Sequence, residues 1–429
     1  MSQLSQRSLS AVWHPCSQMA RLAKVPPIAI TCGDGAWLFD EEGNRYFDTV
    51  SSWWVNILGH ANPRIVSAIG EQASKLPHVM LGGCTHEPAV RLAERLSKRT
   101  NGHLGHAFFA SDGASAVEIA LKQSFHSRAI KGEKTKEKFL CLKHSYHGET
   151  IGALSVTDVP LFQDAYRSLL NASYVVEAPD SRLNNEREAL DALKQLLQER
   201  HGEISALIIE PLIQCGGGMV MHSSSYLRGV RALTKEFDVH LIADEIAVGC
   251  GRTGTFFAWE HVGDSDWPDF LLLSKGISGG NLPLSIVLTS DEVFNQFLSE
   301  DFKAGFLHSH SYTGNPLACA AANVVLDHFD EGLTDQLSTQ TQYLADAFID
   351  ISSDERIADL RQCGMVIAFE VREAVDNFAE KFHVAGRRHE ILTRPIGNTV
   401  YVMPPYLITR EYSEFIVDAL SITLNETLS

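Results

Sequence analysis

Two residues that could do chemistry each follow an apolar segment that the sequence predicts to be a strand. Lys275 comes directly after DFLLLS and precedes GISGG, and Asp244 ends HLIAD. Apolar surroundings disfavour the charged form of lysine, which lowers its pKa and makes the amine a nucleophile for a carbonyl carbon. The alternatives are a surface lysine at the start of a loop and, for Asp244, a helix cap or a loop salt bridge.

A third segment, FFASDGASAVEIALK, could bind an anion. We expect a strand to end at Ala110 and a helix to open with Gly113, Ala114 and Ser115. The free backbone amides of a helix N-terminus, together with the helix dipole, favour a phosphate group there. Many junctions between a strand and a helix share this pattern, and Ser115 would also serve as an ordinary helix cap.

Pyridoxal phosphate is a cofactor that needs all three contributions: a lysine for its aldehyde, a carboxylate at its ring nitrogen and a cradle for its phosphate. Tyr146, in HSYHGET, could stack on the pyridine ring, with a core tyrosine as the alternative. We therefore predict a pyridoxal phosphate site built from Lys275, Asp244, Tyr146, Gly113 and Ala114. Lys275 would be the catalytic residue, first as a general base and then as an acid.

Alternating apolar and amphipathic segments between about residues 65 and 325 position these side chains. Buried strands separated by helices indicate a mainly parallel sheet covered on both faces, and sites in such sheets form at the carboxyl ends of the strands. We expect helices at 114–130 and Ser224–Glu236, and the strands HAFFAS, EKFLCLKH, ALIIEPL, HLIADEI, DFLLLSK and LSIVLTS.

The rest of the chain predicts a second, smaller α+β lobe. AWLFDEEGNRYFD has two short apolar runs around a Glu-Gly-Asn turn, which is typical of a hairpin. GMVIAFEV and TVYVMPP indicate strands, and 410–424 indicates an amphipathic helix. We expect an α/β fold with three parts: an N-terminal segment at 1–64 that belongs to the small lobe, a large cofactor-binding domain at 65–329, and a small α+β domain at 330–429.

The composition is that of a folded globular chain and argues against several classes of protein. Of the 429 residues, 45% are hydrophobic and 21% are charged, and the net charge of -17 argues against a nucleic-acid partner. None of the eight cysteines forms a C-x-x-C pair, so we expect no metal site and no dithiol redox motif. We find no signal peptide and no apolar run of about 18–20 residues, so we expect a cytoplasmic protein with no membrane partner.

From LIADEIAVGCGRTG through DFLLLSKGISGG, the chain resembles the class III, or omega-type, aminotransferases of the fold-type I pyridoxal phosphate enzymes. The Asp-Glu pair, the glycine-rich turn with Arg252 and the Ser-Lys pair match the signature of that family, and the similarity covers nearly the whole chain. The resemblance implies that Lys275 bonds the cofactor aldehyde and that Asp244 faces the ring nitrogen. It also implies that the amides of Gly113 and Ala114 hold the phosphate.

Further motifs narrow the resemblance, namely WHPCSQM, SSWW, HVMLGGCTHEPA, YHGET, HSHSYTGNPLACAAAN and TRPIGNTVYVMPPY. They are similar to the branch of the family that moves an amino group from S-adenosylmethionine to 7-keto-8-aminopelargonate, giving 7,8-diaminopelargonate in biotin biosynthesis. By this resemblance Trp53, Tyr146 and Arg394 contact the substrate. His310 and Ser311 would reach the phosphate of the neighbouring subunit, so that a homodimer shares its active sites.

Two positions in the expected substrate pocket depart from the family pattern. Cys16 stands where the family often has a tyrosine, and Ser309 stands where it often has a glycine. Both changes affect the shape of the pocket and leave Lys275 and Asp244 untouched. An arginine fork suits the carboxylate that both substrates carry, and Arg394 is the candidate, with a surface arginine as the alternative.

The adjacent tryptophans of SSWW have different expected roles. On an extended segment, neighbouring side chains point to opposite sides. We expect Trp53 to line the pocket, where a flat ring suits both the pelargonate chain and a sulfonium cation, and Trp54 to pack in the core. Burial of both rings in the core is the alternative.

Three other functions stay open at this stage. A class III aminotransferase could use lysine, ornithine or 4-aminobutyrate as its donor, although SSWW and HVMLGGCTHEP favour S-adenosylmethionine. An aminomutase on the same scaffold would release no keto product. A non-catalytic protein that binds pyridoxal phosphate would show no turnover.

Overall fold

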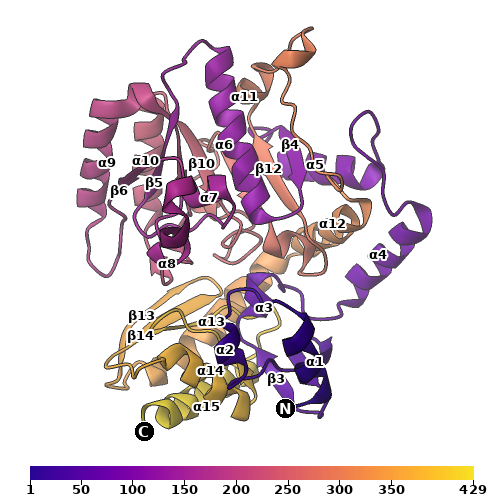
Figure 1. Cartoon of the computed structure of the whole chain (residues 1–429), viewed down its shortest axis with the longest axis vertical. Helices are drawn as coiled ribbons and strands as arrows, with labels where there is room; N and C mark the ends of the chain where they lie inside the picture. Colours follow the sequence, from indigo (N-terminus) through magenta and orange to yellow (C-terminus); the bar gives the residue numbers. More distant parts are fainter.

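The computed structural model describes residues Met1–Ser429 and has two lobes (Figure 1). The large lobe contains a seven-stranded sheet in the order β4-β12-β11-β10-β7-β5-β6. Neighbouring strands from β11 to β6 run parallel, whereas β12 is antiparallel to both β11 and β4. The predicted, mainly parallel sheet is therefore confirmed. Its strands are β4 (His106–Ala110), β5 (Lys138–Leu142), β6 (Tyr174–Val176), β7 (Ile204–Ile209), β10 (His240–Asp244), β11 (Phe270–Leu273) and β12 (Ser285–Thr289).

Helices cover both faces of this sheet. Successive strand residues point to opposite faces, and in the central strands both sets of side chains are mainly apolar and buried. Ile242 belongs to the same apolar cluster as Val117 of α6, whereas its neighbour Leu241 belongs to the cluster that contains Tyr226 of α10. The helix predicted at 224–236 is confirmed as α10, and α6 begins one residue before its predicted start. The helices of this lobe are α4 (Pro63–Lys75), α5 (Glu87–Arg99), α6 (Gly113–Ile130), α7 (Ile151–Ser155), α8 (Pro160–Gln163), α9 (Glu186–Arg200), α10 (Ser224–Glu236), α11 (Asp291–Asn295) and α12 (Pro316–Asp330).

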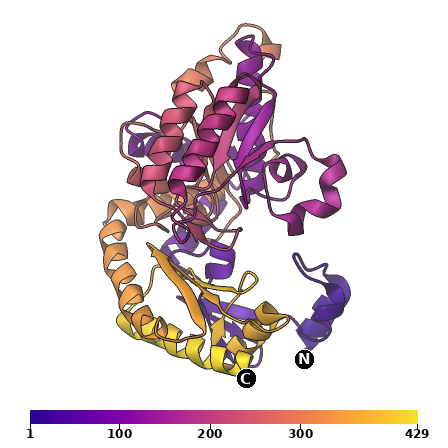
Figure 2. The ribbon, with the colours of Figure 1, turned by 90° about the vertical axis from the view of Figure 1, so that its left-hand side faces the viewer.

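The small lobe combines the two ends of the chain, and both termini lie in it (Figures 1 and 2). The predicted hairpin is present, because β2 (Trp37–Asp40) pairs antiparallel with β3 (Arg45–Asp48). On one side β1 (Ile30–Asp34) extends this sheet, and on the other β15 (Ile391–Leu392) pairs parallel with β3. The first and last parts of the chain therefore share one sheet.

A second, antiparallel sheet and three helices complete the small lobe. The sheet contains the two predicted strands β14 and β16, and the last helix continues to Leu428, past its predicted end at residue 424. No helix of the chain combines the length and the apolar character that a bilayer crossing requires. The elements are β13 (Ile357–Cys363), β14 (Val366–Val371), β16 (Thr399–Val402), α13 (Leu333–Ile351), α14 (Phe378–Arg388) and α15 (Arg410–Leu428).

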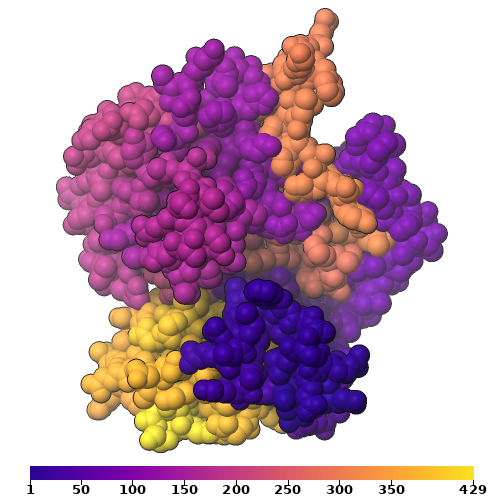
Figure 3. Space-filling view, in the orientation of Figure 1, coloured from indigo at the N-terminus to yellow at the C-terminus, as the bar shows by residue number.

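The N-terminal segment lies against the small lobe, directly beneath the large lobe, where it is indigo in Figure 3. It carries α1 (Gln3–Ala11), α2 (Met19–Leu22) and, after the hairpin, the short turn α3 (Ser51–Trp54). Figure 1 shows α3 at the junction of the two lobes.

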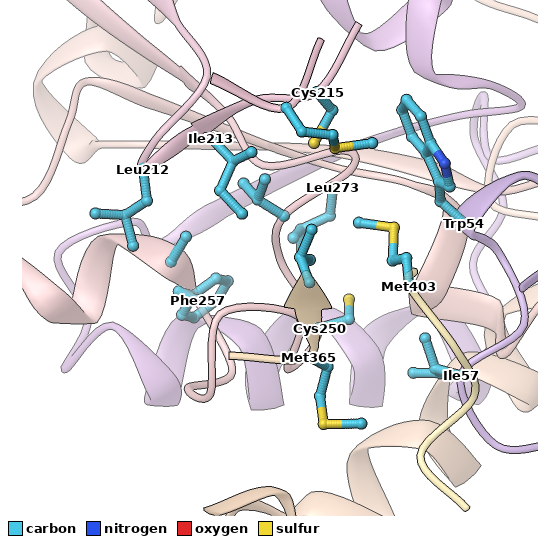
Figure 4. Close-up of a cluster of buried hydrophobic side chains, with 14 of the residues drawn as sticks. Trp54, Ile57, Leu212, Ile213, Cys215, Cys250, Phe257, Leu273, Met365 and Met403 are labelled. Carbon is cyan, nitrogen blue, oxygen red and sulfur yellow. The ribbon is translucent and has the colours of Figure 1, made fainter. Parts of the chain in front are cut away.

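One apolar cluster of 79 buried residues continues from the large lobe into the small lobe. Figure 4 shows a part of it, where Trp54 from α3 lies near Cys215 of the large lobe and Met403 of the C-terminal part. Leu273, the last residue of β11, belongs to the same cluster. The apolar core therefore packs against the end of β11, the strand that leads into Lys275.

Candidate active site

Lys275 follows the end of β11, where the backbone turns into a short 3-10 helix, η4 (Lys275–Ser278). Its φ is +47°, a left-handed value that residues with a side chain rarely adopt. The Ser274 hydroxyl donates a hydrogen bond to the Leu284 carbonyl at 2.8 Å and fixes the residue before the turn. Backbone strain of this kind concentrates at functional positions.

The Lys275 side chain is partly buried, and its amine makes no hydrogen bond or ion pair within the chain. Its Nζ lies 4.6 Å from the ring centroid of Trp54. Desolvation lowers the pKa of Lys275, and the nearby Cys215, Asp244 and Glu210 oppose that shift. An unpaired amine with a lowered pKa can act as a nucleophile and as a base.

Asp244 ends β10, the strand beside β11, so its carboxylate and the Lys275 amine lie at the same edge of the sheet. The side chain is buried, and its Oδ2 accepts a hydrogen bond from Nδ1 of His147 at 2.7 Å. Its Oδ1 accepts the N–H of Ile246 at 3.1 Å. An ionised carboxylate can only accept, so the His147 proton lies on Nδ1, and Nε2 is a buried atom without a partner.

Glu210 is a second buried carboxyl beside Asp244, directly after β7. Oε1 accepts the N–H of Tyr146 at 3.0 Å, and Oε2 accepts the N–H of Cys215 at 2.8 Å. Burial raises the pKa of Glu210 to about 7, although His147 and these two amides oppose the shift. Sequence reasoning missed both His147 and Glu210. His147 adjoins Tyr146 in HSYHGET, and Glu210 ends a predicted strand just as Asp244 does.

Tyr146 lies at this same sheet edge. Its side chain packs so closely against residue 216 that only glycine fits there. A Cβ on Gly216 would lie 2.5 Å from Cβ of Tyr146 and 2.7 Å from its Cγ. The Tyr146 hydroxyl donates a hydrogen bond to Oε1 of Glu149 at 2.9 Å, and the ring contacts Phe162 at a centroid distance of 5.2 Å. Burial, followed by the Glu149 charge, raises the pKa of the phenol, so Tyr146 stays neutral.

The start of α6 has the donors that a phosphate needs. Asp112 caps the helix and accepts both the N–H of Ser115 at 2.9 Å and its hydroxyl at 2.8 Å. Gly113 and Ala114, at the first two helical positions, have no carbonyl one turn earlier to bond, so their amides remain free. Gly148 lets the YHGET loop approach this point, because a Cβ there would lie 2.7 Å from Cβ of Ala114.

These groups fit pyridoxal phosphate. The free amine of Lys275 can bond its aldehyde, and the buried Asp244 can face its ring nitrogen. Asp244 is held in place by His147, whose other ring nitrogen, Nε2, is buried and has no partner within the chain. The free amides of Gly113 and Ala114 match the phosphate.

A second group of predicted residues gathers around Arg394. The guanidinium of Arg394 lies 4.5 Å from the ring centroid of Trp53, and Arg394 makes no ion pair within the chain. Cys16 is exposed and has a left-handed φ of +47°. Burial of its thiol and the charge of Glu149 raise its pKa, and the charge of Arg394 opposes them. The fold therefore brings Cys16, Trp53 and Arg394 together with Glu149, which sequence reasoning missed.

The expectation for the two tryptophans is partly wrong. They do not lie on an extended segment, because α3 is a helical turn with left-handed dihedral angles. Trp53 is 42% exposed, and Trp54 is buried at 8% exposure. The ring of Trp54 also contacts the amine of Lys275, so it does more than fill the core.

Ser309, His310 and Ser311 lie in the loop before α12. His310 contacts His308, whose other ring nitrogen meets Nζ of Lys122, in the middle of α6. None of the three makes a hydrogen bond to Lys275, Asp244 or the start of α6.

Comparison with known proteins identifies the family. The aminotransferase class III family matches residues 18–424. An adenosylmethionine-8-amino-7-oxononanoate aminotransferase of Helicobacter pylori is 43% identical, over 99% of this chain and 98% of its own. The protein of that name from Geobacter sulfurreducens is 36% identical, over 95% of this chain and 94% of its own.

Solved structures agree over the full length. The crystal structure of the adenosylmethionine-8-amino-7-oxononanoate aminotransferase of Methanocaldococcus jannaschii matches with a TM-score of 0.93 at 34% identity, covering 99% of each chain. An (S)-enantioselective omega-transaminase of Thermomicrobium roseum matches with a TM-score of 0.94 at 28% identity, covering 100% of this chain and 99% of the other. The predicted fold-type I architecture is confirmed, and the chain belongs to the class III aminotransferases, enzymes that transfer amino groups with pyridoxal phosphate as their cofactor.

Proposed function

We propose that this aminotransferase moves an amino group from S-adenosylmethionine to 7-keto-8-aminopelargonate and so makes 7,8-diaminopelargonate for biotin synthesis. Relatives with 34–43% identity over nearly the whole chain have names that state this activity. One structural observation supports it most directly. The unpaired guanidinium of Arg394 and the unpaired amine of Lys275 contact two adjacent tryptophans, so a substrate carboxylate and its reacting carbon can be held at fixed separation.

Lys275 supplies the acid–base chemistry. Because its pKa is lowered, the Lys275 amine loses its proton more readily than an exposed lysine does. Nζ can then take a proton from the amine-bearing carbon of the donor and return it to a neighbouring atom. The same residue acts in both half-reactions, because the second reverses the first. When bound, pyridoxal phosphate supplies an electron sink and carries the amino group between the two substrates.

Asp244 and the start of α6 hold the cofactor at its two ends. The Asp244 carboxylate, fixed by His147 and by the N–H of Ile246, keeps a positive charge on the ring nitrogen favourable. The amides of Gly113 and Ala114 donate to the phosphate at the positive end of the helix dipole. Tyr146, held at its backbone by Glu210, would stack its ring on the pyridine of the bound cofactor.

The substrate side accepts two different molecules in turn. Both end in a carboxylate, and Arg394 binds it in each case. The exposed face of Trp53 suits the sulfonium of the donor and the apolar chain of the acceptor. Glu149 adds a negative charge near the cationic donor, and Cys16 has a smaller side chain than a tyrosine would provide at residue 16.

We also propose a homodimer in the cytoplasm. His310 and Ser311 make no hydrogen bond to Lys275, Asp244 or the start of α6 in their own chain, and we propose that they serve the phosphate of the neighbouring subunit. Ser309 would then face the substrate across the same interface. All eight cysteines are unpaired, which fits a reducing compartment.

A second candidate is an aminotransferase that uses another amine, such as lysine, ornithine or 4-aminobutyrate. The similarity to an omega-transaminase over the full chain supports it, because the fold serves both reactions. An aminomutase would use the same residues without releasing a keto product.

The test offers the purified enzyme, loaded with pyridoxal phosphate, one amine at a time together with 7-keto-8-aminopelargonate. We expect S-adenosylmethionine to convert the yellow cofactor to its amine form and to yield diamine and a keto product, both detected by mass spectrometry. The Lys275→Ala variant is the control and should form neither product. Diamine formed faster with lysine, ornithine or 4-aminobutyrate would replace the proposed donor, and rearrangement without a keto product would indicate an aminomutase.

A further inference from the structure

The four residues of α3 (Ser51–Trp54) form a left-handed turn at the junction of the lobes (Figure 1). Their φ values are +49°, +48°, +69° and +73°. None is a glycine, and an L-residue in this conformation brings its Cβ too close to the following carbonyl oxygen. Such a run persists only where the surrounding structure holds it, and strain of this kind concentrates at functional sites.

Asp48 holds the middle of the turn. It is fully buried, its Oδ1 accepts the backbone N–H of Ser52 at 2.8 Å, and its Oδ2 accepts the Ser52 hydroxyl at 2.7 Å. Oδ2 also accepts a hydrogen bond from Nε2 of His60 at 2.9 Å. Ser52 bonds to no other side chain. Both bonds to Asp48 therefore act on the backbone conformation of the turn itself.

The small lobe holds the two ends of the turn. The Ser51 hydroxyl donates to the carbonyl of Met403 at 2.8 Å. The indole Nε1 of Trp54 donates to the hydroxyl of Tyr401, in β16, at 3.0 Å. Bonds to Met403 and Tyr401 thus hold the first and last residues of the turn. We infer that the left-handed conformation of the middle of the turn depends on Asp48.

This conformation aims two indole rings at two parts of the active site. On a helical turn neighbouring side chains are about 100° apart, whereas on a strand they point to opposite sides. Trp54 therefore reaches Nζ of Lys275 at 4.6 Å from its ring centroid, while Trp53 lies under the guanidinium of Arg394 at 4.5 Å. One turn thus contacts both the reacting amine and the candidate carboxylate-binding group.

We propose that Asp48 is a positioning residue for transamination: through Ser52 it keeps the Ser51–Trp54 turn left-handed, and so sets the places of the Lys275 amine and the Arg394 guanidinium. The inference rests on the proposed roles of Lys275 and Arg394. It does not depend on which amine is the donor, because the turn contacts groups that every substrate of this site would meet.

Two substitutions at Ser52 test the backbone part of the proposal. Both Ser52→Ala and Ser52→Gly lose the hydroxyl bond, and both keep the N–H that donates to Asp48. Glycine adopts a positive φ without steric cost, whereas alanine does not. We expect kcat/KM per bound cofactor to fall about tenfold in Ser52→Ala and to stay within about threefold of wild type in Ser52→Gly. Equal losses in the two variants, or no loss in either, would overturn the proposal.

Asp48→Asn tests the carboxylate. We expect kcat/KM to fall about a hundredfold, with a higher KM for both substrates because Arg394 moves and a lower kcat because Lys275 moves. The matched control is His60→Gln, which touches the same carboxylate but leaves both bonds to Ser52 in place, and it should stay within about threefold of wild type. A purely structural role predicts a lower melting temperature with unchanged kcat and KM per bound cofactor, and that result would refute the inference.

The measurements separate this inference from the proposed function. Each variant is compared with wild type using whichever amine the wild-type enzyme accepts best. If S-adenosylmethionine is not that amine, the proposed donor fails while the comparison at Ser52 still decides the role of Asp48. If Asp48→Asn does not fold, the Ser52 pair decides alone.

Discussion

Removal of the negative charge of Asp244 should cause a large loss of turnover. In Asp244→Asn the shape of the side chain is kept and the remaining oxygen can still accept the N–H of Ile246, so the losses are one buried negative charge and the hydrogen bond from Nδ1 of His147. An opposite charge about 4 Å away gains roughly 4 kcal/mol at an effective dielectric near 20. Since about 1.36 kcal/mol corresponds to a tenfold change in rate, turnover should fall by up to about a thousandfold.

The assay is product formation per bound cofactor, with the cofactor counted by its absorbance. Glu245→Gln is the control, because Glu245 is the adjacent buried acid and binds only the backbone amides of Ala258 and Trp259, each at 2.7 Å. It should lower stability and leave turnover per bound cofactor nearly unchanged. Turnover of Asp244→Asn within about tenfold of wild type, or an equal loss in Glu245→Gln, would refute the electrostatic argument.

Four further outcomes are expected. Lys275→Ala should lose the absorbance band of the lysine-bound cofactor, and a retained band would remove Lys275 from its role. Trp53→Ala should raise KM for the substrates by about tenfold while the cofactor Kd changes little; the opposite pattern would contradict its place on the substrate side. Gly216→Ala should displace the Tyr146 ring, because the new Cβ would lie 2.5 Å from that of Tyr146, and should weaken cofactor binding in a fluorescence titration; unchanged binding would mean that the ring is not needed. Burial raises the pKa of Glu245 to about 8, so the unfolded chain releases this proton at lower pH than the folded one. The unfolding free energy should therefore fall as pH rises from about 5 to 8, and urea titrations should show a smaller fall in Glu245→Gln.

Much of the large lobe could be predicted because its signals are local. The apolar runs that end at Asp244 and just before Lys275 define strands, and neighbouring parallel strands end at the same edge of a sheet. The sequence therefore predicted that a free amine and a carboxylate would meet. It did not predict β6, because a strand of three residues is too short to show a period. It also did not predict Glu210, since a carboxyl after a strand has many possible partners.

The sequence alone thus determined the family, the main sheet and the residues at its carboxyl edge, because those features follow from strand pattern and motif spacing. Only the tertiary structure decided the substrate side. The hand of the SSWW turn depends on a buried carboxylate and on bonds to Tyr401 of β16 and to the carbonyl of Met403, and no local propensity favours four left-handed residues in succession. Arg394 and Trp53 likewise meet only because the two ends of the chain share one lobe.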